Sequence, residues 1–338
     1  MNEQKRMRVG LVGCGYHGFS LAQAVNQIEP LQLVACVDLD LTVARQVARL
    51  ARGAAAYESL EEMLAAVPLD AVILATPPHI LYETALVAVH AGKHVLAEKP
   101  IGLDEKEAAQ LEEAVARSGV CYMAGYSFRF CPALQQMHAL LQGGAVGEIQ
   151  AIQGSIGVGP LSSGWHATPA TGGGPLLYVG SHLIDEILWF IDDEPVEVIA
   201  RIRYRADTQA DETTTFGLRF AKGAAAQCLV TQASNGFVNH LEIYGRDGRI
   251  SLRGVDYLNY AVGVISRKLP AYAEPVTIQP RVQGDLKQAM LTAELTEFAQ
   301  AIGEQRQPAI TIRDGRRVLR ILDAVRKADR TGERVRLG

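Results

Sequence analysis

Two patterns of hydrophobic residues divide the chain near residue 124. Up to that point, short apolar runs alternate with segments whose apolar residues recur at the three-and-four spacing of amphipathic helices. The runs predict buried strands and the segments between them predict crossover helices, so this part should form a parallel, doubly wound sheet. The strands are expected at residues 8–12, 31–37, 71–75, 94–97 and 120–124, and the helices at 16–28, 41–51, 79–91 and 104–118.

Beyond residue 125 the pattern changes to consecutive strands. One strongly helical segment, residues 176–191, is followed by runs in which polar and apolar residues alternate. Turn sequences such as Lys222-Gly223 and Asp247-Gly248 connect neighbouring runs, which favours an antiparallel sheet. The runs lie at residues 197–204, 213–220, 225–231, 241–244 and 249–252, and two final helices are expected at 285–302 and 314–328. We therefore predict an α/β protein with a first domain at residues 1–124 and a second at 125–338.

Length and composition narrow the class of protein. A chain of 338 residues, 48% of them hydrophobic, is long enough to bury the cores of two domains. Its 33 basic and 37 acidic residues are mixed along the chain, which argues against a nucleic-acid partner. No apolar stretch reaches the roughly 18 residues of a membrane span. Five cysteines without a CxxC pair are expected to be reduced thiols, and no metal site is predicted.

A glycine-rich turn follows the first predicted strand and reads Gly13-Cys14-Gly15-Tyr16-His17-Gly18. The first glycine permits the tight turn, the second lets backbone amides approach a pyrophosphate, and the third lets the next helix pack closely on the strand. Asp38 ends the second predicted strand, where an acid can accept hydrogen bonds from the adenosine ribose hydroxyls. The alternative is that the glycines only turn the chain and Asp38 caps a helix. Because all these features agree, and because Leu39 stands where an arginine would bind a 2′-phosphate, we expect NAD in preference to NADP.

A lysine stands at the end of the fifth predicted strand, in Ala97-Glu98-Lys99-Pro100. The carboxyl edge of an open α/β sheet is where such sheets bind their ligands. Oxidation of an alcohol needs a base for the hydroxyl proton and a positive charge near the oxygen, and Lys99 can supply the charge. Taken alone, the lysine is better explained as a solvated surface residue.

Together these pieces resemble the glucose-fructose oxidoreductase and inositol dehydrogenase (Gfo/Idh/MocA) family over nearly the whole chain. The matching segments are the glycine-rich turn, Thr76-Pro77, residues 91–95 leading into Glu98-Lys99-Pro100, Arg129-Phe130 with Pro132, and Gly172-Gly173-Gly174 through Gly180, His182 and Asp185. The resemblance implies a Rossmann domain followed by an α/β domain whose open, largely antiparallel sheet often mediates oligomers. It also implies NAD contacts from Tyr16, His17, Thr76, Pro77, His79, Glu98 and Lys99, and makes Lys99 the substrate-binding catalytic lysine.

The helix predicted after the three glycines carries the second part of the candidate site. Tyr178, His182, Asp185 and Trp189 have the spacing of one helical face. His182 is expected to be the general base, because its ordinary pKa lies near neutral pH; a structural histidine is the alternative. The family commonly has an aspartate at the position of Tyr178. A phenol can hydrogen-bond the substrate or pass a proton, but it can also simply line the pocket.

Three further residues are weaker candidates for contacts with substrate. Arg129 follows the strand that leaves the first domain, and Trp165 lies in a loop rich in small and polar residues. A surface-loop role explains either of them equally well. Asp185 could bind a substrate hydroxyl or only hold His182.

The sequence as a whole predicts a dehydrogenase that acts on CH–OH groups and moves a hydride between NAD and a sugar, inositol, sugar acid or related polyol. Two alternatives stay open: a glycoside hydrolase that uses NAD for a transient oxidation, and a catalytically silent NAD-binding sensor. We expect the protein to work in the cytoplasm as a homo-oligomer, a dimer or a tetramer, with no membrane partner.

Overall fold

The computed structural model describes residues 6–255, 259–282 and 284–338, which fall into two compact units. The first unit comprises Met1–Ser127 and Lys287–Arg317, and the second comprises Phe128–Leu286 and Val318–Gly338. The first unit is therefore built from two separate segments of the chain. The sequence pattern predicted a helix in the second segment but placed it in the second domain.

A parallel sheet forms the core of the first unit. Among the described residues it has six strands in the order β3-β2-β1-β4-β5-β6, which is a Rossmann order. The strands are β1 (Met7–Val12), β2 (Leu31–Val37), β3 (Ala55–Tyr57), β4 (Ala71–Leu74), β5 (His94–Glu98) and β6 (Tyr122–Gly125). Every residue of β4 is fully buried, because helices cover both faces of a sheet of this kind.

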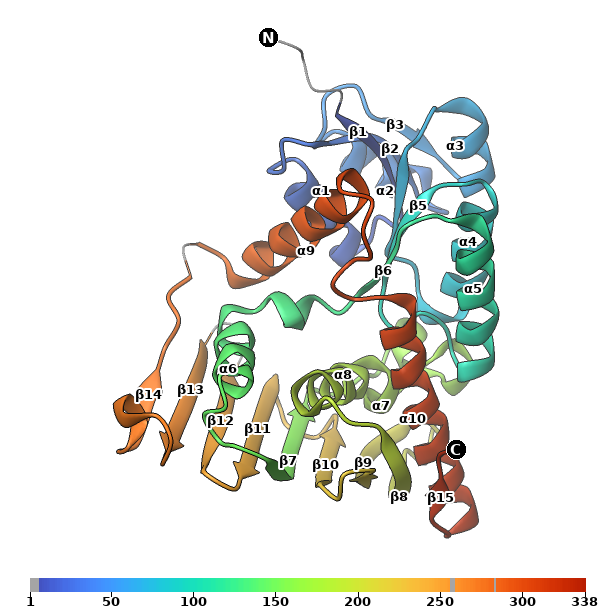
Figure 1. Ribbon diagram of the computed structural model, residues 1–338. Coiled ribbons are helices and arrows are strands. Elements are labelled where there is room, and N and C mark those ends of the chain that lie inside the picture. Colours follow the sequence, from blue (N-terminus) through green and yellow to red (C-terminus); the bar gives the residue numbers. More distant parts are fainter. Residues whose placement is uncertain (1–5, 256–258, 283) are drawn as a thin grey trace. The chain divides into compact units, whose positions relative to one another are not determined.

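Helices connect successive strands of this sheet, as the three-and-four spacing predicted for four of the five. They are α1 (Tyr16–Val25), α2 (Leu41–Ala48), α3 (Leu60–Ala66), α4 (Pro78–His90) and α5 (Glu105–Ser118). Ser59 and Asp104 accept backbone N–H groups at the first turns of α3 and α5, which fixes where these helices begin. Figure 1 shows α3, α4 and α5 on one side of the sheet and α1 on the other.

A segment from the far end of the chain completes the first unit. It contains most of α9 (Leu286–Gly303) and the beginning of α10 (Ile312–Thr331). The backbone N–H of Ala124 in β6 donates to the carbonyl oxygen of Ile310 at 3.1 Å. Arg316 forms ion pairs with Glu105 and Glu112 of α5 at 2.7 and 3.0 Å. Both the sheet edge and a crossover helix therefore hold this returning segment.

The second unit is built on a larger sheet. Within the part of the chain that is described, it has nine strands in the order β14-β13-β12-β11-β7-β10-β9-β8-β15. The central strand β7 (Ile149–Gly157) pairs in parallel with β10 (Ala225–Thr231), and the other pairs are antiparallel. The remaining strands are β8 (Pro195–Tyr204), β9 (Asp211–Phe220), β11 (Val238–Gly245), β12 (Gly248–Val255), β13 (Asn259–Ser266), β14 (Val276–Ile278) and β15 (Val335–Arg336).

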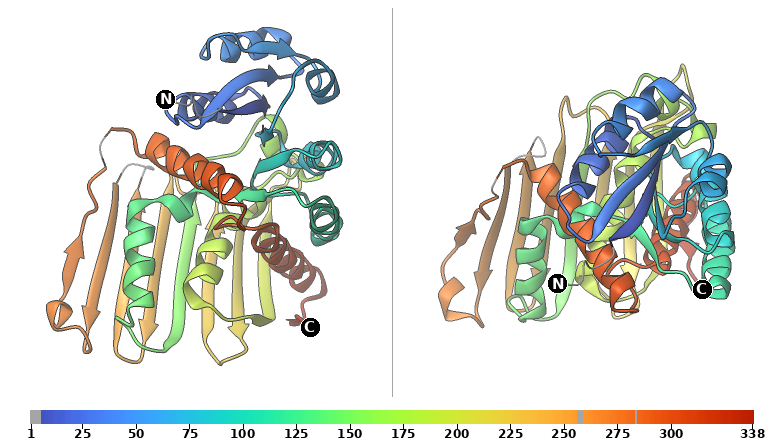
Figure 2. Two further views of the ribbon diagram at one scale, coloured as in Figure 1. Left: turned by 45° about the horizontal axis from the view of Figure 1, so that its top comes forward. Right: turned by 90° about the horizontal axis from the view of Figure 1, so that it is seen from above.

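Helices cover one face of this larger sheet (Figures 1 and 2). They are α6 (Pro132–Gln142), α7 (Pro175–Tyr178) and α8 (Gly180–Ile191). A side chain at Gly154 of β7 would come within 2.8 Å of Leu183, so this glycine lets α8 approach the central strand closely. Short 3-10 helices lie at Ser127–Phe130, Gly164–Ala167, Pro169–Thr171 and Pro270–Tyr272.

The opposite face of the larger sheet is not covered by these helices. Side chains there alternate with the buried ones, and three of the exposed ones are large and apolar: Ile199 (52% exposed), Leu229 (38%) and Tyr244 (41%). A hollow of about 890 Å³ lies on the same face, with Arg201 and Arg253 among its lining residues. This face therefore presents both apolar and charged groups.

The predicted α/β fold class is confirmed, with a parallel Rossmann sheet and a second, mostly antiparallel sheet. The predictions omitted β3, α3, α6, β7, β13, β14 and β15. The single helix predicted at residues 176–191 was wrong, because α7 and α8 are separated at Val179. Among the described residues, no helix combines the length and the apolar character needed to cross a bilayer.

Candidate functional site

The glycine-rich turn of the first unit connects β1 to α1 and has the geometry of a phosphate cradle. Gly13 has a φ of 89°, and a side chain there would come within 2.6 Å of the carbonyl oxygen of Ala75. A side chain at Gly18 would collide with the carbonyl oxygen of Gly13, whereas the space above Gly15 is open to at least 4 Å. The turn therefore needs glycine at its first and third positions for packing, and leaves room at the second for a ligand.

Asp38 lies directly after β2 and holds the glycine-rich turn. Its carboxylate accepts the backbone N–H of Cys14 at 2.8 Å and that of Asp40 at 3.1 Å. The next side chain, Leu39, is 88% exposed. The acid is thus fixed at the end of the strand, and an ionised carboxylate keeps further lone pairs for ribose hydroxyls.

The end of β4 supplies a second stretch of the expected cofactor site. The hydroxyl oxygen of Thr76 is buried, and within the described residues it has no hydrogen-bond partner. Pro77 precedes the first turn of α4, which also contains His79. A buried hydroxyl without a protein partner next to the glycine-rich turn is what a site for a polar ligand requires, because such a group is costly to leave unpaired.

The end of β5 brings Lys99 next to the same turn. Nε2 of His17, on the first turn of α1, lies 2.6 Å from Oε1 of Glu98. Burial alone would raise the pKa of Glu98, but His17 and Lys99 together lower it. Burial lowers the pKa of Lys99 to about 8, and the charge of Glu98 opposes this. Two groups that the sequence placed separately, the glycine-rich turn and the strand-end lysine, therefore form one polar cluster.

These residues fit NAD. The open space over Gly15, the unpartnered hydroxyl of Thr76 and the fixed acid Asp38 correspond to what a pyrophosphate and an adenosine ribose would contact. Bound NAD would supply the carbon that accepts or donates a hydride.

His182 in the second unit packs against aromatic rings. The residue is 6% exposed, and its imidazole stacks on Phe128 with 4.1 Å between ring centroids and 15° between planes. Phe128 in turn contacts the edge of Phe237 at 5.8 Å. The ring of the candidate base is therefore held in a defined orientation by α8 and by its stacking partner.

One turn further along α8, Asp185 forms a buried ion pair with Arg129. The carboxylate accepts two hydrogen bonds from the guanidinium, at 2.9 and 2.6 Å, and the two side chains are 2% and 8% exposed. The guanidinium carbon lies 5.7 Å from the ring centroid of Trp189, which stacks on His138. Two of the weaker substrate-binding candidates thus contact each other, in a fork geometry that fixes both.

Tyr178 ends α7 and belongs to an aromatic cluster. The rings of Trp165 and His166 stack at 3.7 Å, and Tyr178 meets both edge-on, at 5.7 and 4.8 Å. The neighbouring glycines allow this arrangement: Gly174 donates to the carbonyl oxygen of His166 at 3.0 Å, and a side chain at Gly173 would come within 2.6 Å of the same oxygen. The three-glycine block therefore holds the loop of Trp165 against Tyr178.

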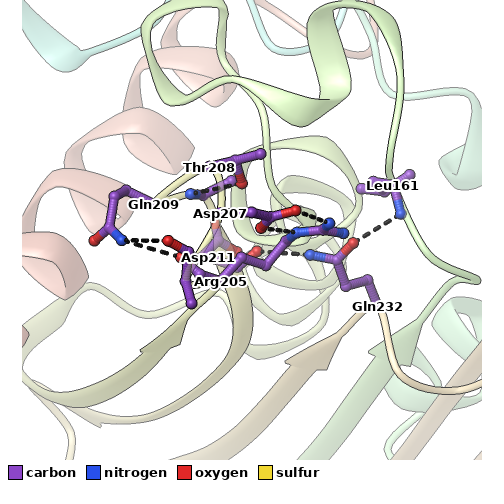
Figure 3. Close-up of polar contacts among 9 residues, drawn as sticks. Leu161, Arg205, Asp207, Thr208, Gln209, Asp211 and Gln232 are labelled. Atoms are coloured by element: carbon purple, nitrogen blue, oxygen red, sulfur yellow. Dashed lines mark hydrogen bonds and ion pairs between the residues drawn. The ribbon is translucent and has the colours of Figure 1, made fainter.

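A polar network fixes the other side of this loop (Figure 3). Gln232 accepts the backbone N–H of Leu161 at 2.7 Å and donates to the carbonyl oxygen of Asp211 at 3.0 Å. The carboxylate of Asp211 accepts the N–H of Leu176, in α7, at 2.7 Å. Burial raises the pKa of Asp211 to about 6, although the bond from Leu176 opposes the rise.

A second buried acid on α8, next to Asp185, was not identified from the sequence. Glu186 of α8 is fully buried and accepts a hydrogen bond from the side-chain amide of Asn239 at 2.8 Å. Burial raises the pKa of Glu186 to about 8; Asn239 opposes the rise and the charge of Asp185 adds to it. Only its apolar sequence neighbours Ile184 and Ile187 could have indicated burial, although α8 is buried on nearly all sides.

Comparison with known proteins identifies the family. Residues 7–126 match the model of the oxidoreductase family with an NAD-binding Rossmann fold, and residues 134–251 match the GFO/IDH/MocA C-terminal domain. Over 73% of this chain and 74% of its own length, the trans-1,2-dihydrobenzene-1,2-diol dehydrogenase of Danio rerio is 31% identical. The chain belongs to the Gfo/Idh/MocA family. It is accordingly an oxidoreductase-family protein with an NAD-binding Rossmann domain.

Two further relatives of this Gfo/Idh/MocA protein span most of its length. The 1,5-anhydro-D-fructose reductase of Ensifer adhaerens is 29% identical over 81% of this chain and 82% of its own. The crystal structure of GenD2 from gentamicin A biosynthesis, which contains NAD, is 25% identical, with a TM-score of 0.86 over 99% of this chain and 97% of that chain.

The structure distributes the predicted site residues of this Gfo/Idh/MocA protein over its two units. The first unit holds the expected cofactor residues, and within it Gly13, His17, Asp38, Glu98 and Lys99 lie in one connected region. The second unit holds the rest, in two groups: Arg129 with Asp185, and Tyr178 with Trp165; His182 stacks on Phe128. The roles of these residues in binding and catalysis stay predictions.

Proposed function

We propose that the protein is a dehydrogenase that transfers a hydride between NAD and a secondary alcohol carbon of a sugar, inositol, sugar acid or related polyol. The observation that carries the proposal is the 2.6 Å contact between His17 of the glycine-rich turn and Glu98, because it fixes Lys99 next to the cofactor turn. The dihydrodiol dehydrogenase and the anhydrofructose reductase are named for small ring compounds that carry oxygen substituents, which supports this substrate class.

Each candidate residue has a separate task in this reaction. The ammonium of Lys99 would donate a hydrogen bond to the alcohol oxygen and stabilise the negative charge that develops there. The imidazole of His182 would accept the hydroxyl proton, and Tyr178 would hydrogen-bond the substrate. Because Asp38 lies where a 2′-phosphate would bring negative charge, we propose that NAD is preferred over NADP.

We further propose that the protein works in the cytoplasm as a homo-oligomer. All five cysteines are free thiols, which suits a reducing compartment. The uncovered face of the larger sheet, with Ile199, Leu229 and Tyr244 exposed, is the surface that a second copy would cover.

A substrate screen tests the proposed reaction. The purified full chain is incubated with NAD, and in parallel with NADP, against a panel of sugars, inositols and sugar acids, and NADH absorbance is recorded. A Lys99→Met preparation controls for contaminating dehydrogenases. Net NADH from the wild type alone supports the proposal. Cleavage of a glycoside without net NADH would identify a hydrolase instead, and NAD binding without turnover across the panel would identify a sensor.

A further inference from the structure

Asp211, the first residue of β9, holds the short helix that ends at Tyr178. One oxygen of its carboxylate accepts the backbone N–H of Leu176 in α7 at 2.7 Å, although the two residues are 35 positions apart in the chain. A side chain at Gly174 would collide with the other carboxylate oxygen, so the acid lies directly against the glycine that precedes α7. Both oxygens of Asp211 are therefore fixed at the start of this helix.

The main chain of the same residue holds the loop that carries Trp165. The side-chain amide of Gln232 donates to the carbonyl oxygen of Asp211 at 3.0 Å, and its oxygen accepts the N–H of Leu161 at 2.7 Å. Gln232 is 3% exposed, so water competes little for either bond. Figure 3 shows this chain of contacts from Leu161 through Gln232 to Asp211. The loop and α7 are thus both attached to one residue.

A helix of a single turn depends on its neighbours for its position. α7 has four residues, begins at Pro175, and receives no side-chain cap from its N-cap Gly174. Asp211 supplies the cap from another strand. Burial raises its pKa to about 6, so the carboxylate is still ionised at neutral pH and its bond to the helix is charge-assisted. Tyr178 ends the same turn and meets the ring of Trp165 edge-on, so the position of both rings depends on this cap.

We propose that Asp211 is a positioning residue that holds Tyr178 and Trp165 in the arrangement that binds the substrate. The inference rests on the proposed function, in which Tyr178 hydrogen-bonds the substrate, and Asp211 acts through these two rings. Without the carboxylate, the N–H of Leu176 loses its acceptor, so α7 and the loop separate more often. The arrangement that binds the substrate is then present in a smaller fraction of the molecules, which weakens substrate binding by the same factor.

The fluorescence of Trp165 tests the positioning role without a substrate. The chain has two tryptophans, so Trp189→Phe leaves Trp165 as the only one. In this background, Asp211→Ala should raise the acrylamide quenching constant about 2-fold, because the indole loses the cover of Tyr178. Asp211→Asn keeps an acceptor oxygen and should leave the constant unchanged. Circular dichroism checks that each variant folds, and Asp211→Ser replaces the alanine variant if that one does not. Unchanged quenching in the folded alanine or serine variant would overturn the proposal, and so would an equal rise in Asp211→Asn.

A carboxylate at the opposite end of β9 provides the matched control. Asp193 is 9% exposed and accepts the backbone N–H of Lys222, just after β9, at 2.8 Å. Asp193→Ala removes a similar bond from the same unit, so it should lower thermal stability and leave the quenching of Trp165 unchanged. A rise in quenching equal to that in Asp211→Ala would show that any lost bond loosens the second unit, and the positioning role would be wrong.

Kinetics connect this position to the proposed reaction. On a substrate found in the screen, Asp211→Ala should lower kcat/KM by about 2-fold to 30-fold, the range for the loss of one helix cap, and Asp211→Asn should recover most of it. The Kd of NAD, measured by isothermal titration calorimetry, should not change, because the expected cofactor residues belong to the first unit. A folded alanine variant with wild-type kcat/KM would overturn the proposal, as would a loss of NAD affinity that explains the whole decrease. A wild-type chain without turnover would instead refute the proposed function, and the quenching of Trp165 would then decide the positioning role alone.

Discussion

Asp185→Asn should destabilise the second unit by about 3 to 5 kcal/mol, because it leaves the guanidinium of Arg129 buried without its counter-charge. The two side chains are 2% and 8% exposed, so water can solvate neither of them in place of the lost partner. The two hydrogen bonds of 2.6 and 2.9 Å are also both charge-assisted. An asparagine keeps the shape and one acceptor but removes the charge, which puts the expected loss near the lower end of this range.

The cost belongs to the unpaired charge and not to the pair itself. Two charges buried together lose much of their hydration, and this loss offsets most of their attraction. The double variant Arg129→Met with Asp185→Leu should therefore recover most of the lost stability and lie within about 1 to 2 kcal/mol of wild type. The single variants Arg129→Met and Asp185→Leu form, with the double variant and the wild type, a cycle that isolates the interaction of the two residues.

Tryptophan fluorescence during urea unfolding measures the effect in the right part of the molecule. The chain has two tryptophans, and both Trp165 and Trp189 belong to the second unit. With a slope of about 2 kcal/mol per molar urea, a loss of 3 kcal/mol moves the midpoint down by about 1.5 M. Circular dichroism in the same titration follows the whole chain and shows whether the first unit keeps its own transition.

Two results would refute this reasoning. An Asp185→Asn chain that unfolds at the wild-type urea concentration would mean that the guanidinium is solvated or paired elsewhere. A double variant as unstable as the sum of the two single variants would mean that packing, and not the unpaired charge, determines the loss.

Three further predictions concern the chemistry of single residues. Lys99→Met should keep NAD affinity but lower kcat by roughly 10² to 10³. Because burial lowers the pKa of Lys99 to about 8, wild-type kcat should fall as pH rises through that value, and the kcat of Lys99→Arg should not show this fall. Tyr178→Phe should lower kcat/KM by about 5-fold to 150-fold if the phenol hydrogen-bonds the substrate, whereas a residue that only lines the pocket would change it little. Burial raises the pKa of Glu186 to about 8 from an ordinary 4.5, so between these pH values the folded state binds more protons than the unfolded state. The free energy of unfolding should therefore fall as pH rises through this window, and urea titrations of Glu186→Gln should show a shallower fall.

The first unit was predictable because its signals are local. Buried parallel strands are continuous apolar runs, and β1, β2, β4, β5 and β6 all have them. The glycine-rich turn depends on steric limits that only glycine meets, so its role could be inferred from the residue type. β3 was missed because its sequence, Ala-Ala-Tyr, is three residues long and only half-buried.

Contacts between distant segments were not predictable in the same way. The pattern of α9 shows that it is a helix, but nothing in it tells which unit it joins, because packing partners far apart in sequence leave no periodic trace. The contacts of Lys287 in α9 with Tyr16 and Ser20 in α1 therefore could not be predicted from the sequence, although they are short. The same holds for the hydrogen bond between His17 and Glu98, which joins two motifs that were each recognised separately.

The break between α7 and α8 shows how tertiary packing overrides a periodic pattern. Residues 176–191 have helical spacing throughout, yet Val179 interrupts the helix. Asp211 binds the N–H of Leu176 in α7, and a side chain at Gly180, where α8 begins, would come within 3.2 Å of Val230 in β10. Each segment is therefore positioned by its own neighbours, so Tyr178 contacts Trp165 while His182 stacks on Phe128.

Two adjacent acids on α8 show why helical spacing cannot assign chemical roles by itself. Asp185 and Glu186 are both buried, but Asp185 faces the guanidinium of Arg129 whereas Glu186 faces the amide of Asn239. A guanidinium compensates a negative charge and an amide does not, so near neutral pH the first acid is ionised in an ion pair and the second keeps its proton. Neither acid then offers His182 an uncompensated negative charge.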